Sequence, residues 1–397
     1  MFGLGTHGPD GRYGLVVDIG STSVGLAIVA SEPGLDLPVQ VWAHREHAPL
    51  QGKDDLSVSE RHLKTAILNA FLEFSQHGLA TLAQHDRAGR VTHVMTAIAA
   101  PWSYTLSKTV TLKHEEPFDL TPAIVRQLSE KATKHAKDVL RHDEIAARLQ
   151  LRTISDEIIS ITANDYTIHV QEALAISKVT VTMLTGLARE GIVAAIEEAI
   201  DKVVPKAAVS INTFMALFYQ AVRDHLPNLQ EVCLLDVTNE ATELGVVRSG
   251  VLRHTSHIPY GYHTLARHLE KASNLSHEEA RGLMRDVETE YGIITPEKTA
   301  LSNVEQIYES NLTGLFTRTG DDLSIPKTIF LHTDLRTEGY FAARAKSAAH
   351  QSTGLRYAVR PITSQLFGGS EDADTALLLS SYVFHKRLYE TSYLHQS

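Results

Sequence analysis

Two segments far apart in the chain each place an aspartate at the end of an apolar strand, directly before a turn. In the first segment, Asp18 ends an apolar run at residues 15–17 and precedes the small residues Gly20, Ser21, Thr22 and Ser23. Backbone N–H groups and short hydroxyls in such a turn can converge on a phosphate without a Cβ in the way. A carboxylate at the strand end can hold Mg²⁺, usually through its waters. The segment therefore predicts a phosphate-binding turn, although any hairpin turn favours Gly and Ser for conformational reasons alone.

The second segment repeats this pattern at residues 232–247. Asp236 follows an apolar run, and a short polar stretch at residues 238–241 leads to Thr242 and a second apolar strand. Two such turns predict a duplicated domain whose halves face one another across a cleft. Phosphate and a divalent metal are expected in that cleft, with Asp18 and Asp236 as the metal ligands.

Composition limits the class of protein. The chain has 397 residues, 43% of them hydrophobic, which is enough for two or three domains with apolar cores. Its formal net charge of -10 gives no basic footprint, so nucleic-acid binding is not expected. Cys233 is the single cysteine, which excludes an intrachain disulfide and fits a reducing compartment.

Membrane and export signals are not evident in the sequence. No apolar run reaches the roughly 18 to 20 residues that a membrane span needs, and residues 1–12 lack the basic head and apolar core of a signal peptide. The sequence contains neither an H-E-x-x-H nor a C-x-x-C motif. Its 21 histidines are therefore interpreted as surface or core residues and not as zinc ligands. We therefore expect a cytoplasmic protein.

Apolar periodicity predicts an alternation of strands and helices. Strands are expected at residues 13–30 as a hairpin, and at 39–45, 91–99, 106–112, 157–168, 178–184, 232–247 as a second hairpin, 252–261 and 328–332. Helices are expected at residues 59–77, 121–140, 189–203, 209–223, a stretch after 276, 304–316 and 374–386. The strands and helix between residues 91 and 186 are expected to form a compact insert.

The order of these pieces resembles the actin-like ATPase superfamily, and within it the type represented by FtsA of cell division and PilM of type IV pilus assembly. The stretch Asp18-Ile19-Gly20-Ser21-Thr22-Ser23-Val24-Gly25 is similar to the first phosphate motif of that superfamily, and residues 236–247 occupy the place of the second. Residues 250–261 resemble FtsA in sequence and position. The resemblance implies an α/β fold, actin-like and duplicated on a ribonuclease H-like plan, with an inserted strand-helix-strand-strand domain.

The resemblance also implies a domain plan. Residues 13–90 and 187–230 would form the first actin-like half, and residues 91–186 the inserted domain for partner binding or polymerisation. Residues 231–397 would form the second half, with a short inserted subdomain at about 263–327. Residues 374–379 resemble the last connecting helix of the superfamily.

Site roles follow from the same resemblance. Asp18 would position Mg²⁺, and Asp236 would orient the metal or a water molecule. The expected ATP phosphate contacts are Gly20, Ser21, Thr22, Ser23 and Thr242. Two motifs depart from the pattern: Thr238-Asn239-Glu240-Ala241 replaces the glycines of the second phosphate motif, and residues 329–334 lack the glycine pair of the adenosine motif. A glutamate beside the phosphates would repel them, so we expect at most a slow ATPase.

Three functions fit this sequence. The first is an FtsA/PilM-like cytoplasmic scaffold that binds ATP and Mg²⁺ weakly and couples cleft closure to self-association, in an oligomer or filament, or to partner recruitment. The second is a non-catalytic pseudo-ATPase module of a type IV pilus platform. A small-molecule kinase is a remote third, because the sequence shows no sugar-binding loop with a catalytic aspartate. Expected partners are FtsZ-like or pilus inner-membrane proteins, which would recruit the chain to the inner face of the membrane, because residues 385–397 offer only a weak apolar stripe.

Overall fold

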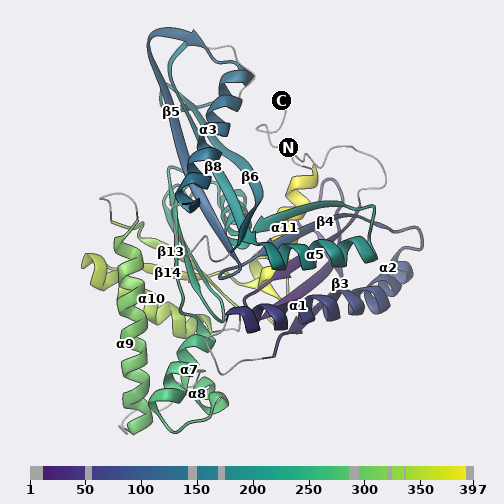
Figure 1. Ribbon diagram of the computed structural model, residues 1–397, viewed down its shortest axis with the longest axis vertical. Helices are drawn as coiled ribbons and strands as arrows, with labels where there is room; N and C mark the ends of the chain where they lie inside the picture. The colour runs from purple at the N-terminus through teal and green to yellow at the C-terminus, as the bar shows by residue number, and fades with distance from the viewer. Residues whose placement is uncertain are drawn as a thin grey trace.

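Two five-stranded sheets of identical topology and a smaller four-stranded sheet form the molecule (Figure 1). The computed structural model describes residues 12–49, 56–141, 150–168, 175–285, 295–319, 324–334 and 337–389. Expectations that concern residues 1–11, 286–294 and 390–397 lie outside the described residues. Each five-stranded sheet has an antiparallel three-stranded meander followed by two parallel strands.

The first sheet has the order β3-β2-β1-β4-β9. Its strands are β1 (Tyr13–Ile19), β2 (Ser23–Ala30), β3 (Val39–His47), β4 (Val91–Ile98) and β9 (Ala208–Thr213). β1 and β2 are buried at every position, as expected for apolar runs covered by helices on both faces. One face packs on α1 (Leu56–Glu73), which continues through a π-helical turn (Phe74–Gly78) into α2 (Leu79–His85), and on α5 (Glu190–Val203).

The second sheet repeats this plan in the order β12-β11-β10-β13-β14. Its strands are β10 (Val232–Val237), β11 (Thr242–Arg248), β12 (Val251–Ile258), β13 (Thr328–Thr333) and β14 (Ala358–Pro361). Its outer face packs on α7 (Tyr262–Ala272), α8 (His277–Arg285), α9 (Pro296–Thr317) and α10 (Glu338–Thr353). The matching strand orders confirm the duplication that the two acidic turns predicted.

A central apolar cluster joins the two sheets. It contains α6 (Phe214–His225), α11 (Thr375–Tyr389), the 3₁₀ turn Ser364–Phe367, and residues from β1, β10 and β13 such as Val16, Leu234 and Phe330. Gly14 of β1 allows the ring of Phe384 to lie directly on the strand, where a Cβ would overlap it. The last helix therefore packs on the first sheet, although the chain that carries it has just left the second.

The small sheet, in the order β5-β8-β6-β7, forms the insert, which projects away from both halves in Figure 1. It consists of β5 (Ser103–Asp119), α3 (Pro122–Arg141), β6 (Leu151–Ala163), β7 (Tyr166–Thr167) and β8 (Ala175–Arg189). The strand-helix-strand-strand order is as expected, with β7 as a two-residue addition. α3 covers one face of this sheet and shares an apolar cluster with it.

Two expected boundaries are wrong. The insert does not begin at residue 91, because β4 pairs in parallel with β1 and β9 and belongs to the first sheet. The second half does not contain everything from residue 231 onward, because α11 packs on β1 and β2. Order along the chain does not determine which sheet a buried strand or helix joins.

One expected helix is also corrected. Residues 208–213 form the edge strand β9, and helix α6 begins only at Phe214, where the Thr213 side chain accepts a hydrogen bond from the Ala216 N–H. This N-terminal cap separates strand from helix inside a continuous apolar stretch. Helix α10 and strand β14, together with α2 and α7, were not anticipated.

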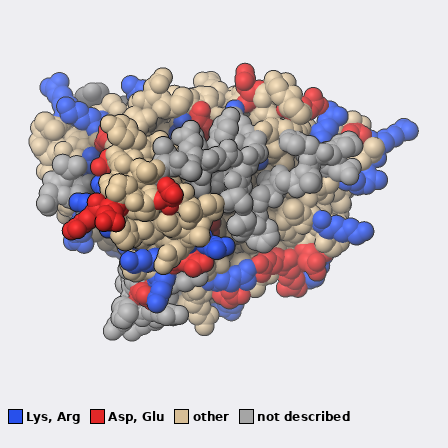
Figure 2. Space-filling view, turned by 90° about the horizontal axis from the view of Figure 1, so that it is seen from above, with Lys and Arg blue, Asp and Glu red and all other residues tan. Residues whose placement is uncertain are grey.

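Charge on the surface is mixed. On the described part of the face in Figure 2, Lys and Arg side chains lie among Asp and Glu side chains. Among the described residues, no helix is both long and apolar enough to cross a membrane.

We predict that Gly14→Ala destabilises the protein by about 2 kcal/mol, since the added methyl group must displace the Phe384 ring and with it α11. Gly314→Ala is the control, because Gly314 lies inside α9 and a Cβ added there would have no neighbouring atom within 4 Å. This change should stabilise the protein by about 0.5 to 1 kcal/mol through helix propensity. Urea unfolding measures both, and equal stability of the two variants would contradict the packing of α11 on β1.

Candidate functional site: the cleft between the two acidic turns

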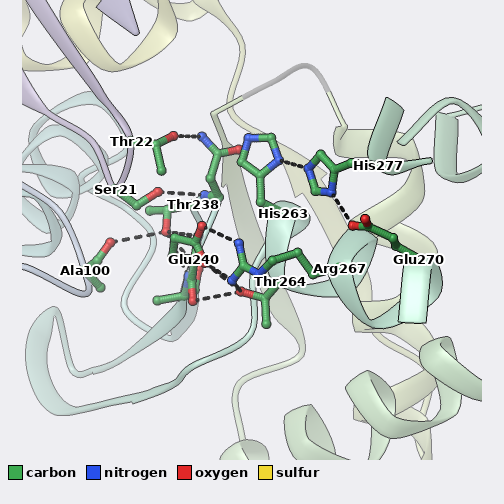
Figure 3. A network of polar contacts seen from close by, with 12 residues as sticks. Ser21, Thr22, Ala100, Thr238, Glu240, His263, Thr264, Arg267, Glu270 and His277 are labelled. Atoms are coloured by element: carbon green, nitrogen blue, oxygen red, sulfur yellow. Dashed lines mark hydrogen bonds and ion pairs between the residues drawn. The ribbon is translucent and has the colours of Figure 1, made fainter. Parts of the chain in front are cut away.

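The two turns contact each other directly. The backbone N–H of Asn239 donates a 2.9 Å hydrogen bond to Ser21 Oγ, and the Asn239 side-chain amide donates a 2.8 Å bond to Thr22 Oγ1. Asn239 belongs to the second turn, and both hydroxyls belong to the first turn, whose Ser21 and Thr22 are labelled in Figure 3. Trp102, at the base of the insert, donates from its indole N–H to the Ser21 carbonyl at 2.9 Å. The two hydroxyls expected to meet phosphate therefore already accept hydrogen bonds from protein.

The second turn is held from behind by the N-terminus of α7. The Tyr262 N–H donates to the Thr238 carbonyl at 3.1 Å, and the His263 N–H donates to the Asn239 carbonyl at 2.8 Å. Gly261 permits this approach, because a Cβ there would overlap the backbone of residues 238–240. Free N–H groups at a helix N-terminus can bind an anion, but here the N–H groups of Tyr262 and His263 already donate to backbone carbonyls.

Glu240 points into α7 and forms a bidentate pair with Arg267 (Figure 3). The two N···O distances are 2.9 and 2.6 Å, and Thr264 Oγ1 donates to the same carboxylate at 3.0 Å. Arg267 is itself buried. The negative charge that the sequence placed beside the phosphate site is thus compensated inside the second half.

Asp18 forms an ion pair within the first half. Arg45 Nη2 lies 2.6 Å from Asp18 Oδ2, while Arg45 Nε lies 2.5 Å from Asp374 Oδ2 and Nη1 donates to Ser23 Oγ at 2.8 Å. Burial raises the pKa of the Asp18 carboxyl, and Arg45 opposes that rise without cancelling it. The expected metal ligand of the first half already has a cationic partner.

Asp236 has the same kind of partner in the second half. His332 Nδ1 lies 2.7 Å from Asp236 Oδ1, and both side chains are buried. Burial lowers the pKa of His332, but the hydrogen bond and charge of Asp236 outweigh it and raise that pKa to about 9. His332 therefore carries a positive charge at neutral pH, at a place where the superfamily pattern has the adenosine motif. The Phe214 ring centroid lies 4.9 Å from that of His332.

Asp334 is a third acid of this cleft that sequence reasoning did not select. Its Oδ2 is covered and has no hydrogen-bond partner among the described residues. Burial, and then the charge of Asp236, raise the pKa of Asp334 to about 7. Asp236 Oδ2 is likewise covered and unpartnered within the described part of the chain.

The remaining expected site residues have structural contacts. The Gly20 N–H closes the first turn by donating to the Ser23 carbonyl at 2.9 Å. Thr242 is buried in the second half, where its hydroxyl donates to the Tyr260 carbonyl at 2.7 Å and lies 3.0 Å from the Tyr308 hydroxyl. The structure brings Ser21 and Thr22 to the cleft, but it directs the Thr242 hydroxyl into the core.

These contacts allow a test of whether the cleft fits Mg²⁺ and a nucleotide. The hydroxyls of Ser21 and Thr22 are engaged by Asn239, and the carboxylates of Asp18 and Asp236 each face a cationic side chain. Among the described residues, no group of three or more His, Cys, Asp or Glu side chains is arranged to hold a metal ion. The residues as placed do not fit a magnesium-nucleotide complex. Magnesium ligation by Asp18 and Asp236 stays a prediction.

Comparison with solved structures defines the fold. No protein-family model matches the chain, and no curated protein sequence matches it. A chain of the PilM–PilN type IV pilus biogenesis complex is similar over 96% of this chain and 99% of its own, with 14% identity and a TM-score of 0.59. The ethanolamine utilization protein EutJ from Carboxydothermus hydrogenoformans covers 97% of this chain and 91% of its own, with 12% identity and a TM-score of 0.45.

The chain has the actin-like ATPase fold, a mixed α/β architecture. The similarity to the chain of the PilM–PilN complex extends over nearly the full length of both chains. At 14% identity, this similarity establishes the fold and leaves the chemistry of the cleft to the residues described above.

We predict that Asp334→Asn becomes more stable than the wild type as pH rises. The pKa of Asp334 is raised from 3.8 to about 7, so its contribution is fully present below the unfolded value and is lost as pH rises through the folded value. Asparagine does not ionise, and one pKa unit corresponds to about 1.4 kcal/mol, so the difference in unfolding free energy should grow by on the order of 4 kcal/mol between about pH 4 and pH 8. Urea unfolding across this range measures it, with the exposed Asp165→Asn as control. If the unfolding free energies of the wild type and Asp334→Asn changed with pH in parallel, the raised pKa of Asp334 would be refuted.

Proposed function

We propose that the protein is a non-catalytic, actin-like scaffold of a type IV pilus-type assembly platform, which binds a membrane-associated protein partner and does not turn over ATP. The observation that carries this proposal is the pair of hydrogen bonds from Asn239 to Ser21 and Thr22. Protein atoms join the two turns where the superfamily pattern would place phosphate. The pilus assignment rests on the similarity to PilM, whose solved complex includes PilN.

The insert is the part of the scaffold best placed to transmit a change in the cleft to a partner, because both halves brace its base. Thr105 Oγ1 lies 2.6 Å from Thr213 Oγ1 of the first half, and Ser107 Oγ donates to the Leu252 carbonyl of the second half at 2.6 Å. Arg387 of α11 adds an ion pair to Glu157 of β6 at 3.3 Å. A rotation of one half against the other must therefore change the orientation of the insert, because the insert contacts both halves.

A nucleotide-responsive scaffold of the FtsA kind is the second candidate. Asp236 Oδ2 and Asp334 Oδ2 favour it, since covered carboxylate oxygens without a described partner are suitable acceptors for a hydrated cation. In this alternative Asp18 and Asp236 hold Mg²⁺, and ATP displaces Asn239 from Ser21 and Thr22. Self-association or binding to an FtsZ-like protein would then follow cleft closure.

Titration of Mg-ATP against the purified chain separates the two candidates. We predict no saturable heat of binding up to millimolar nucleotide for the wild type and for Asp18→Ala, because the hydroxyls and carboxylates of the cleft are already paired. The exposed Asp165→Ala serves as the matched aspartate control. Micromolar binding that Asp18→Ala abolishes and Asp165→Ala retains would establish the nucleotide-responsive scaffold instead.

Recruitment to the inner face of the membrane is tested by vesicle flotation. We predict that the purified protein does not float with protein-free vesicles containing anionic lipid. It should float with vesicles that carry the pilus inner-membrane protein encoded in the same genome. Flotation with protein-free vesicles, or none with the partner present, would contradict the proposed recruitment.

A further inference from the structure

The guanidinium group of Arg45 binds side-chain oxygen atoms from three segments of the chain. It contacts Asp18 at the end of β1 at 2.6 Å, Ser23 at the start of β2 at 2.8 Å, and Asp374 ahead of α11 at 2.5 Å. Asp374 also caps α11, because its Oδ1 accepts the Leu377 N–H at 3.1 Å. One cationic side chain thus links the first acidic turn to the start of the last helix.

Strand register explains how Arg45 reaches Asp18 from two strands away. Asp18 pairs with Gly25 of β2, and Gly25 pairs with Arg45 of β3, so the three residues form one row across the sheet. A Cβ on Gly25 would lie 2.7 Å from Arg45 Nη2. The absence of a side chain at Gly25 therefore opens the path along which the arginine crosses β2.

Burial makes a counter-charge at this place necessary. Asp18 is only 3% exposed, and a buried carboxylate without a cation is costly. Burial raises the pKa of Asp374, but the charge and hydrogen bond of Arg45 overcome this and hold that pKa below its usual value. The group that could supply the counter-charge from outside the protein is a divalent cation, for which carboxylate and hydroxyl oxygens are suitable ligands.

We propose that Arg45 permanently takes the place of a divalent cation in the first half, so that the junction of β1, β2 and α11 forms without metal. Removal of the guanidinium would leave Asp18, Ser23 and Asp374 as an oxygen site that accepts Mg²⁺. The proposal concerns this junction alone and is independent of the pilus partner. At Asp18, the first half then differs from the superfamily pattern by the substitution of one cation for another.

The second half supplies a parallel case from its own residues. Asp236 pairs in register with Glu243 of β11 on one side and with His332 of β13 on the other, so a basic side chain again lies in the row of the acidic corner. His332 meets Asp236 from the adjacent strand, whereas Arg45 meets Asp18 across Gly25. Each half thus neutralises its own aspartate by a different basic residue from its own sheet.

The experiment measures the melting temperature of the full chain with millimolar MgCl₂ or with NaCl at matched ionic strength. The wild type should show the same melting temperature in both salts. Arg45→Ala should melt about 5 °C lower in NaCl, because it leaves Asp18 without its partner. MgCl₂ should restore at least half of that loss. Arg152→Ala is the matched control, since Arg152 pairs with Glu197 on the surface, and neither salt should distinguish it from the wild type.

Two results would overturn the proposal: a melting temperature of Arg45→Ala that does not respond to MgCl₂ beyond the control, or a wild type that MgCl₂ itself stabilises. If Arg45→Ala does not fold in NaCl, Arg45→Gln replaces it, because glutamine removes the charge while retaining a hydrogen-bond donor. Arg45→Gln should show the same selective gain with MgCl₂, and its failure to do so would also refute the substitution. A merely structural role of Arg45 would lower the melting temperature equally in both salts.

Discussion

The constraint on which the rest of the structure depends is that two aspartates are buried where the halves of a duplicated domain meet. Asp18 and Asp236 end corresponding strands, and both are almost fully covered. Arg45 and His332 supply the compensating charge from within each sheet. Because the charges of Asp18 and Asp236 are compensated, the two turns can lie close enough for Asn239 to donate hydrogen bonds to the hydroxyls of Ser21 and Thr22. The Asp18–Arg45 pair, the Asp236–His332 pair and the hydrogen bond from Asn239 to Ser21 therefore depend on one another.

Duplication gives the two sheets the same strand order, yet their surroundings differ. Helices α6 and α11 lie between the sheets and belong to one shared apolar core, while α7 closes behind the second turn and Glu240 pairs with Arg267 there. The changes from the superfamily pattern are concentrated in the second half, where Thr238-Asn239-Glu240-Ala241 makes contacts to protein in place of a glycine-rich loop. The actin-like architecture is retained because its cores need apolar periodicity, which these substitutions leave intact.

Sequence predicted the elements that local pattern determines. The two hairpins follow from apolar runs broken by small residues, and α3 and α5 follow from helical periodicity and their starts. It misplaced β4 and α11, because the partner of a buried strand or helix depends on contacts far along the chain. Arg45 and Asp374 are 329 positions apart, and nothing in either neighbourhood indicates their pairing. The direction of the Thr242 hydroxyl is also set by distant residues. Gly25, which has no side chain and lies between Asp18 and Arg45 in strand register, is the signal that could have pointed to the Asp18–Arg45 pair.

The central claim is that protein groups hold the two acidic turns together without nucleotide. Hydrogen–deuterium exchange of the backbone amides at residues 18–25 and 236–242, followed with and without Mg-ATP, tests it most directly. The account predicts that both turns, including the Asn239 N–H bonded to Ser21, are protected in the absence of nucleotide and that Mg-ATP leaves the rates unchanged. Fast exchange in both turns that becomes slow on addition of Mg-ATP would contradict it.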